Sequence, residues 1–272
     1  MAFDLSSITE ETRLRAPRII LLGVEKIGKS TFAAGADSPI FLPIQGEEGI
    51  DELKVGKTPD VCGSAREVLG WLYALGREDH SYQTVVIDSA SSLEPIIYAE
   101  ICEENRAESI NEGSLQFGVG HDKATVVWRQ IAETLDALRS CKNMASILIG
   151  HVKIKRFDDP NGQSYDQYQW DVHQKTASLF YRWADSILFC NTKVVVQEEK
   201  LGFHKDNVKK RGIDVAPGSR FLYTQKRPAH PGGGRGVFGR LPYEISLGNS
   251  PDPKDCWSHF QDAVDAKLQK GQ

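Results

Sequence analysis

One eight-residue segment constrains this chain of 272 residues more than any other feature of its sequence. It reads Gly23-Val24-Glu25-Lys26-Ile27-Gly28-Lys29-Ser30 and fits the pattern G-x-x-x-x-G-K-[ST] without a mismatch. The apolar residues 18–22 predict a buried strand before it, and residues 29–36 predict a helix after it. In that context the pattern indicates a phosphate-binding loop, because its glycines let backbone N–H groups curl around phosphate oxygens. We expect Lys29 to reach the β- and γ-phosphates of a nucleotide and the Ser30 hydroxyl to bind Mg²⁺.

A second metal ligand is expected at the end of a neighbouring buried strand. Residues 84–87 form a short, mostly β-branched segment, and Asp88 follows it directly. This places Asp88 at the carboxyl edge of the sheet beside the phosphate loop, where it would hold Mg²⁺ through water. Thr31, next to Ser30, is expected to pack or hydrogen-bond near the nucleotide rather than to bind metal.

Hydrolysis of a bound nucleotide also requires a group that orients or deprotonates the attacking water. The acidic loop 45–51 follows a strand predicted at 39–44 and contains three carboxylates, those of Glu47, Glu48 and Asp51. A carboxylate from this loop would lie at the same sheet edge as Asp88. A solvated acidic turn is the alternative interpretation.

The order of predicted elements indicates the fold class. A fourth strand is predicted at 146–149, and further helices at 65–75, 94–104 and 126–138. Strands that alternate with helices predict an α/β fold with a mostly parallel central sheet and helices on both faces. Shorter strands at 187–189, 193–197, 220–224 and 244–247 predict a short antiparallel extension. We expect a single domain over residues 1–272, with an N-terminal arm at 1–17 and a C-terminal helical tail at 248–272.

Composition excludes several classes of protein. The chain is 40% apolar and 26% charged, which is ordinary for a globular protein. Its five cysteines are scattered and form no C-x-x-C pair, which argues against a disulfide framework and a zinc site. No apolar stretch is long enough to span a membrane, and the N-terminus has no signal-like core, so we expect a cytoplasmic protein without a membrane partner.

The formal net charge of −4 conceals an asymmetry between the two halves of the chain. Residues 1–122 carry 10 Lys/Arg and 21 Asp/Glu, whereas residues 123–272 carry 23 and 16. Residues 215–243 hold five basic side chains and no acidic one. A polyanion therefore has a candidate surface on the second half, although balance across the fold or an oligomer contact explains the charges equally well.

Asn161-Gly162 lies between two segments of mixed cationic and aromatic character, and this dipeptide is a strong hairpin signal. Cations on the first arm would follow a nucleic-acid backbone, and aromatic rings on the second would stack on bases. The candidate residues for single-stranded nucleic acid are Lys153, Lys155, Arg156, Tyr165, Tyr168 and Trp170. The alternative is an ordinary hairpin whose aromatic side chains face the core.

Several segments together carry a resemblance to a known family. Residues 88–95 follow the pattern D-S-x-x-x-L-x-P, and residues 146–155 form a strand that ends in a polar residue and continues into a basic loop. The chain resembles the RecA-type branch of P-loop ATPases in these segments and in the phosphate loop. It resembles more closely the phage-encoded minimal RecA-core (AAA-type) ATPases that include single-strand annealing proteins, through residues 151–174, 182–185 and 241–242. The resemblance spans residues 17–247 and implies a RecA-like P-loop NTPase core.

This resemblance implies roles for particular residues. ATP and Mg²⁺ would be the cofactors, and Glu48 would be the water-activating carboxylate, with Glu47 as the alternative. His151 replaces the usual RecA sensor glutamine and would sense the γ-phosphate; a structural histidine at a strand end is the alternative. Arg235 or Arg240 would reach the γ-phosphate of a neighbouring subunit, as cations do in RecA-type assemblies.

The resemblance also implies a function. We expect a slow, DNA-stimulated ATPase that forms a homo-oligomer, either a ring or a filament, in the cytoplasm of a phage host. It would bind single-stranded DNA and promote strand annealing or homologous pairing, with a single-strand DNA-binding protein as a further partner. The alternatives are a nucleotide-gated replication adaptor, such as a helicase loader, and the less favoured small-molecule kinase.

Overall fold

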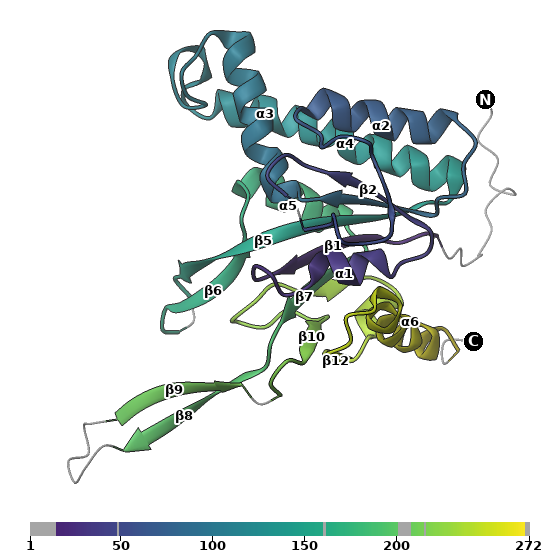
Figure 1. Ribbon diagram of the computed structural model, residues 1–272. Helices are drawn as coiled ribbons and strands as arrows, with labels where there is room; N and C mark the ends of the chain where they lie inside the picture. Colours follow the sequence, from purple (N-terminus) through teal and green to yellow (C-terminus); the bar gives the residue numbers. More distant parts are fainter. Residues whose placement is uncertain (1–14, 48, 160–161, 201–207, 215, 270–272) are drawn as a thin grey trace, which may run out of the picture.

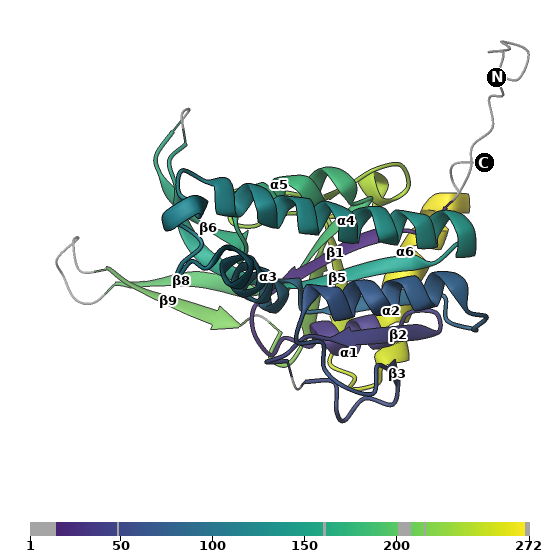
Figure 2. The same ribbon diagram turned by 90° about the horizontal axis from the view of Figure 1, so that it is seen from above.

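The structure, a computed structural model, describes residues 15–47, 49–159, 162–200, 208–214 and 216–269. Its centre is a twisted sheet between two layers of helices (Figures 1 and 2). The helices are α1 (Lys29–Ala34), α2 (Ala65–Arg77), α3 (Ala90–Asn105), α4 (Val119–Lys142), α5 (Gln174–Trp183) and α6 (Pro253–Gln269). The strands are β1 (Arg18–Gly23), β2 (Pro39–Pro43), β3 (Gly56–Lys57), β4 (Thr84–Asp88), β5 (Ala145–Phe157), β6 (Tyr165–Trp170), β7 (Ser186–Asn191), β8 (Val194–Lys200), β9 (Val208–Asp214), β10 (Arg220–Tyr223), β11 (Gly233–Gly234) and β12 (Glu244–Gly248).

The strand order in the main sheet is β12-β10-β7-β1-β5-β4-β2-β3. The strands from β7 to β3 run parallel to their neighbours, whereas β10 and β12 are antiparallel. This arrangement confirms the expected α/β class with a mostly parallel central sheet and a short antiparallel extension. The phosphate-loop strand β1 lies between β5 and β7, and the carboxyl ends of the parallel strands share one edge of the sheet.

One strand differs from the sequence expectation. Residues 187–189 were expected in the antiparallel extension, but they belong to β7, which pairs in parallel with β1. The reason is the helix α5, which the sequence analysis did not identify. Two parallel strands need a crossover connection, and α5 supplies it before β7 begins.

The alternation of side chains along β1 explains why helices cover both faces. Ile20 and Leu22 pack in the cluster formed with α2, α3, α4 and α5, whereas Ile19 and Leu21 pack in the cluster formed with α1 and α6. All four side chains are fully buried. A strand that is apolar on both faces requires cover on both sides, and this is typical of parallel sheets.

Two hairpins extend beyond the body of the sheet (Figure 1). The long strand β5 continues past the sheet edge and pairs antiparallel with β6, so the predicted hairpin is present. Strands β8 and β9 form a separate two-stranded sheet, which contains the predicted strand at 193–197. No helix within the described residues is long and apolar enough to cross a membrane.

Candidate nucleotide-binding site

The glycine-rich turn after β1 has the backbone geometry of a closed loop. Gly28 precedes the first residue of α1 and adopts φ +93°, a left-handed conformation that other residues rarely adopt. A Cβ at this position would also lie 2.5 Å from Nη1 of Arg220. The second glycine of the motif is therefore required by its backbone conformation, and the neighbouring Arg220 guanidinium would have to move to admit a side chain.

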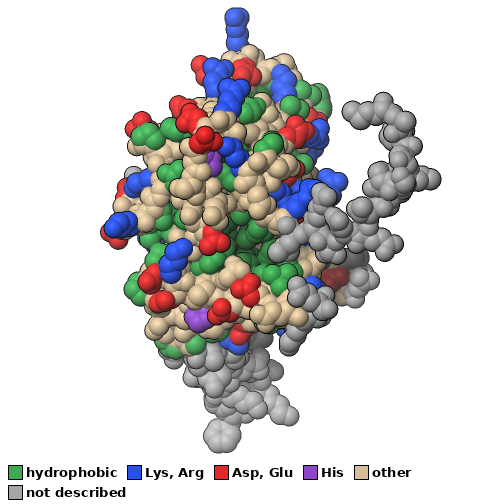
Figure 3. Space-filling view, turned by 90° about the vertical axis from the view of Figure 1, so that its right-hand side faces the viewer, with side chains coloured by type: hydrophobic (Ala, Val, Ile, Leu, Met, Phe, Trp, Pro, Cys, Tyr) green, Lys and Arg blue, Asp and Glu red, His purple; other side chains and the backbone are tan. Residues whose placement is uncertain are grey.

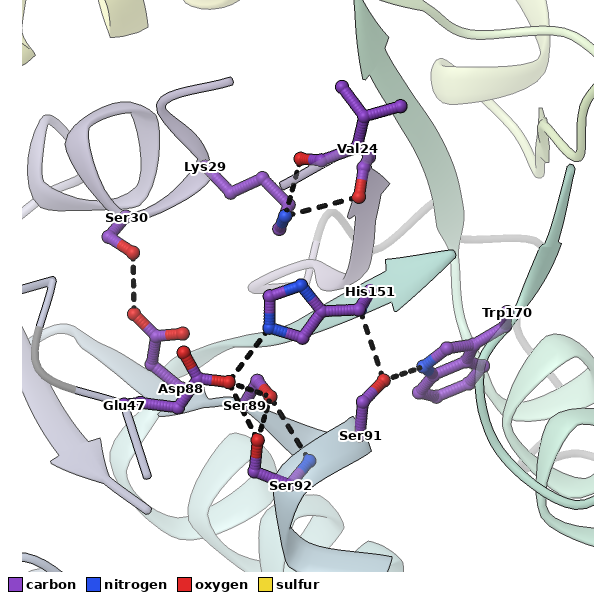
Figure 4. A network of polar contacts seen from close by, with 11 residues as sticks. Val24, Lys29, Ser30, Glu47, Asp88, Ser89, Ser91, Ser92, His151 and Trp170 are labelled. Carbon is purple, nitrogen blue, oxygen red and sulfur yellow. Dashed lines mark hydrogen bonds and ion pairs between the residues drawn. The ribbon is translucent and has the colours of Figure 1, made fainter. Parts of the chain in front are cut away.

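Lys29 closes this loop from inside. Its side chain is buried, and Nζ donates to the carbonyl oxygens of Gly23 at 3.1 Å and Val24 at 2.9 Å (Figure 4). Burial lowers the pKa of Lys29, because the charged form loses solvation, and the negative charge of Asp88 offsets this only in part. A phosphate group would supply the anionic partner that this ammonium lacks.

Ser30 and Asp88 meet across the same site. The Ser30 hydroxyl donates to Oδ2 of Asp88 at 2.6 Å, and Asp88 is only 3% exposed. Burial raises the pKa of Asp88 to about 6, against the hydrogen bond from Ser30, which lowers it. A hydroxyl and a carboxylate are ligands that suit Mg²⁺ together with phosphate oxygens, since this ion rarely uses an all-protein cage. Consistent with that, the described residues contain no group of three or more His, Cys, Asp or Glu that would hold a metal alone.

Glu47 is the carboxylate that the structure brings into the site. Its Oε1 accepts hydrogen bonds from Oγ of Ser89 and Ser92, both at 2.7 Å, and from Nε2 of His151 at 2.8 Å (Figure 4). Burial alone would raise the pKa of Glu47, but the hydrogen bonds from His151, Ser92 and Ser89 lower it to about 2. Glu48, the carboxylate favoured by the resemblance, lies outside the described residues.

His151 lies at the sheet edge where β5 leaves the core. Its ring Nδ1 is buried and has no hydrogen-bond partner within the described part of the chain. In the view of Figure 4 the ring lies between the ammonium of Lys29 and the carboxylate of Glu47. An unpaired buried nitrogen facing a phosphate-binding loop is a site for a ligand atom, because such groups are costly when left unpaired.

The backbone of His151 is joined to the hairpin through one serine. Oγ of Ser91 accepts hydrogen bonds from the backbone N–H of His151 at 3.0 Å and from Nε1 of Trp170 at 3.2 Å (Figure 4). Ser91 lies in the first turn of α3, three residues after Asp88. Ser91 therefore links the start of α3 to His151 on β5 and to Trp170 on β6.

The candidate nucleic-acid residues on the hairpin do not share one surface. Trp170 is 2% exposed and packs against Phe180 and Tyr181 of α5, so its assignment as a base-stacking residue is wrong. The register that pairs Trp170 with Val152 turns its ring toward the core. Tyr168 is partly buried beside Phe189, at 5.2 Å between ring centroids.

The remaining hairpin residues lie nearer to solvent. Tyr165 packs on Phe157 with 5.4 Å between ring centroids. Lys153 forms an ion pair with Asp171 at 2.7 Å, and Arg156 lies 3.9 Å from Asp158. Lys155 is exposed and makes no ion pair within the described residues.

A cavity of about 820 Å³ lies between this hairpin, α5 and the loop before β11. Its lining includes four cations and no carboxylate, together with aromatic rings; the cations are Lys153, Lys155, Arg182 and Lys226. The sequence analysis missed Arg182 in this role and placed Lys226 only in a general basic tract. On the face shown in Figure 3, by contrast, Lys and Arg are interspersed with Asp and Glu.

Arg235 is remote from the phosphate loop of its own chain. Strand β11 pairs with Ser186 and Ile187, the first residues of β7, and the Arg235 backbone N–H donates to the carbonyl of Asp185 just before them. The guanidinium donates to the carbonyl of Arg182. The phosphate loop lies beside the other end of β7, where Gly23 pairs with Cys190. Arg240, the alternative, is exposed in a single helical turn at Phe238–Arg240.

Together the fold and this site are those of a P-loop nucleotide-binding domain. A model of the AAA domain family matches residues 15–236, and the chain therefore belongs to this family. Among curated proteins no relative matches. Among solved structures the chain is similar to the crystal structure of the RadB recombinase, with 14% sequence identity and a TM-score of 0.44 over 88% of this chain and 90% of the other.

Proposed function

We propose that this protein is a phage-type recombination ATPase that binds single-stranded DNA and promotes strand annealing or homologous pairing. The observation that carries the nucleotide part is the meeting of Lys29, the Ser30–Asp88 pair and the Glu47–His151 pair at one sheet edge. Lys29 and the Ser30–Asp88 pair suit a nucleoside triphosphate with Mg²⁺. The Glu47–His151 pair suits an attacking water and the γ-phosphate.

The chain's own residues divide the work of hydrolysis. Lys29 would exchange its two carbonyl partners for phosphate oxygens, and Ser30 and Asp88 would hold Mg²⁺, which would neutralise charge on the phosphates. Glu47 orients the water. With a pKa of about 2, Glu47 is a weak base while three donors hold its Oε1. Release of one of these donors would raise its basicity toward the range that general bases require.

The cationic cavity supports the DNA part of the proposal. Of the four cations in the lining, Lys153 is paired with Asp171, whereas Lys155, Arg182 and Lys226 form no ion pair within the described residues and would attract a phosphodiester backbone. The tyrosines of the lining offer ring faces for bases. The cavity is connected to the ATP site through Trp170, Ser91 and His151. Loss or gain of the γ-phosphate at His151 would therefore be transmitted to the surface that holds DNA.

The proposal is tested by ATP turnover of the full chain with and without single-stranded DNA. We expect DNA to stimulate turnover and ATP to strengthen DNA binding, because the two sites share a hydrogen-bonded connection. Turnover that responds only to a helicase, and not to DNA, would instead favour the replication adaptor. Strand annealing measured with Lys29→Met then shows whether the nucleotide site is needed for that activity.

A further inference from the structure

The helix that carries Lys29 and Ser30 is too short to be stable alone. Helix α1 has six residues, and helices of this length depend on tertiary packing. Most of that packing comes from α6. The ring of Phe32 lies 5.0 Å from Trp257 and 5.7 Å from Phe260, between centroids. The C-terminal helix therefore places the two P-loop residues that hold phosphate and metal.

Helix α6 also holds the end of α1 that is remote from the phosphate loop. Nζ of Lys254 donates to the carbonyl oxygens of Gly35 and Ala36, each at 3.1 Å. A cation at this end of a helix is favourable because it satisfies the last free carbonyls. Gly35 lies directly against the backbone of Pro253, and a Cβ there would overlap the Pro253 carbonyl.

Arg220 makes the corresponding connection at the phosphate loop. Its Nη1 lies against Gly28, while Nη2 donates to the carbonyl of Ser250 and to Sγ of Cys256 at 3.0 Å. One guanidinium thus lies beside the loop while it is hydrogen-bonded to the start of α6 and to the residue Ser250 before it. Within the described residues Arg220 forms no ion pair with a carboxylate, and its guanidinium lies beside the predicted phosphate loop.

We propose that Arg220, Lys254 and α6 form a clamp on the P-loop helix, in which Arg220 is a positioning residue, so that ATP binding and docking of α6 stabilise each other. The inference rests on the proposed function, since it requires ATP at the P-loop. Helix α6, with Lys254, lies outside residues 15–236 that match the AAA domain model, whereas Arg220 lies within them. Because the coupling of two binding equilibria is reciprocal, each must strengthen the other by the same factor.

The first test uses the unaltered protein. Hydrogen exchange of the α6 backbone amides is measured with and without saturating ATPγS and Mg²⁺, and calorimetry under the same conditions shows whether the nucleotide binds. We expect exchange in α6 to slow at least about fivefold, the lower end of typical coupling factors. Binding without slower exchange in α6 overturns the clamp and leaves the proposed function standing. Absence of binding overturns both.

The second test separates Arg220 from general packing. Arg220→Ala is expected to weaken ATPγS binding about tenfold and to remove the ATP-dependent protection of α6. Arg220→Lys should restore only part of the ATPγS affinity and of the protection of α6, because one ammonium cannot reach the loop, Ser250 and Cys256 together. Arg77→Ala, an exposed arginine at the end of α2, is the control and keeps both properties. Unchanged affinity and unchanged protection in Arg220→Ala overturn the proposal; if this variant fails to fold, exchange in the unaltered protein still decides.

Discussion

Lys29 is a buried ammonium whose hydrogen bonds go to two backbone carbonyls rather than to a carboxylate. We expect Lys29→Met to abolish most ATP binding and turnover. Its melting temperature should equal or exceed that of the unaltered protein, since the change removes a buried charge and keeps the apolar stem. Calorimetry with ATP and a thermal melt check this, with Lys54→Met as the exposed control. Normal turnover in Lys29→Met would contradict the phosphate-site assignment.

Two adjacent carboxylates compete for the water-activating role, Glu48 by resemblance and Glu47 by its contacts with His151 and the two serines. We expect Glu47→Gln to preserve ATP affinity and to slow turnover about 10²-fold, the usual scale for loss of a general base. Glu48→Gln is the matched control and should change turnover little. The reverse pattern would return the role to Glu48.

Asp88 predicts a pH dependence of stability. Its pKa rises from 3.8 in the unfolded chain to about 6 in the fold, so its favourable contribution is complete below pH 4 and is lost as pH rises through 6. At pH 7 the ionised carboxylate destabilises the fold by roughly 3 kcal/mol. We expect Asp88→Asn, which keeps an acceptor for Ser30, to be more stable than the unaltered protein at pH 7.5 without nucleotide or Mg²⁺. Thermal melts at pH 4.5 and 7.5 test this. If the stability difference between Asp88→Asn and the unaltered protein is as large at pH 4.5 as at pH 7.5, ionisation of Asp88 is not its cause.

At the scale of elements, the β5–β6 hairpin and the loop before β11 form the two sides of the cationic cavity. Lys155 and Lys226 come from opposite sides, and neither forms an ion pair within the described residues. We expect their joint replacement by Ala to weaken single-stranded DNA binding and to lower its salt slope by about 1.4, since each phosphate contact contributes about 0.7. Affinity measured across a salt series gives the slope, with Lys54→Ala as control. An unchanged slope would place the DNA elsewhere.

The two ends of β6 should respond differently to substitution. Trp170→Ala removes a buried ring and should destabilise the fold by about 3–5 kcal/mol. The molecules that remain folded should keep their DNA affinity, although they lose the hydrogen bond from Trp170 to Ser91. Tyr165→Ala should leave stability nearly unchanged and cost about 1–3 kcal/mol of DNA affinity if its ring stacks on a base. Melts and DNA titrations of both variants check this. If both variants keep the DNA affinity of the unaltered protein, the aromatic rings of the hairpin do not belong to the DNA site.

At the scale of the whole molecule, local patterns predicted the parts of the site that depend on local structure. The phosphate loop and Asp88 each follow a buried strand, and parallel strands bring such ends to one edge whatever the details of packing. The hairpin was also predictable from a local pattern, the dipeptide Asn161-Gly162 between two extended segments.

Contacts that depend on tertiary register were not predictable in this way. The inward direction of Trp170 follows from its pairing with Val152, and a shift of one residue would have turned it outward. The contact of Arg220 with Gly28 depends on how β10 pairs with β7, far from either residue in sequence. Which of Glu47 and Glu48 enters the site was likewise not predictable, because the two are adjacent in a loop and a loop has no periodicity that would fix the direction of a side chain.

The position of Arg235 has a consequence for symmetry. The phosphate loop lies at the carboxyl edge of the sheet, and Arg235 lies at the amino edge, beside the first residues of β7. If Arg235 completes the ATP site of another copy, that copy must present its carboxyl edge to this amino edge. Such a contact joins two unlike surfaces and is heterologous, so no two-fold axis can generate it. All subunits would then face the same way, so a filament would have two different ends, whereas a ring would close on itself without ends.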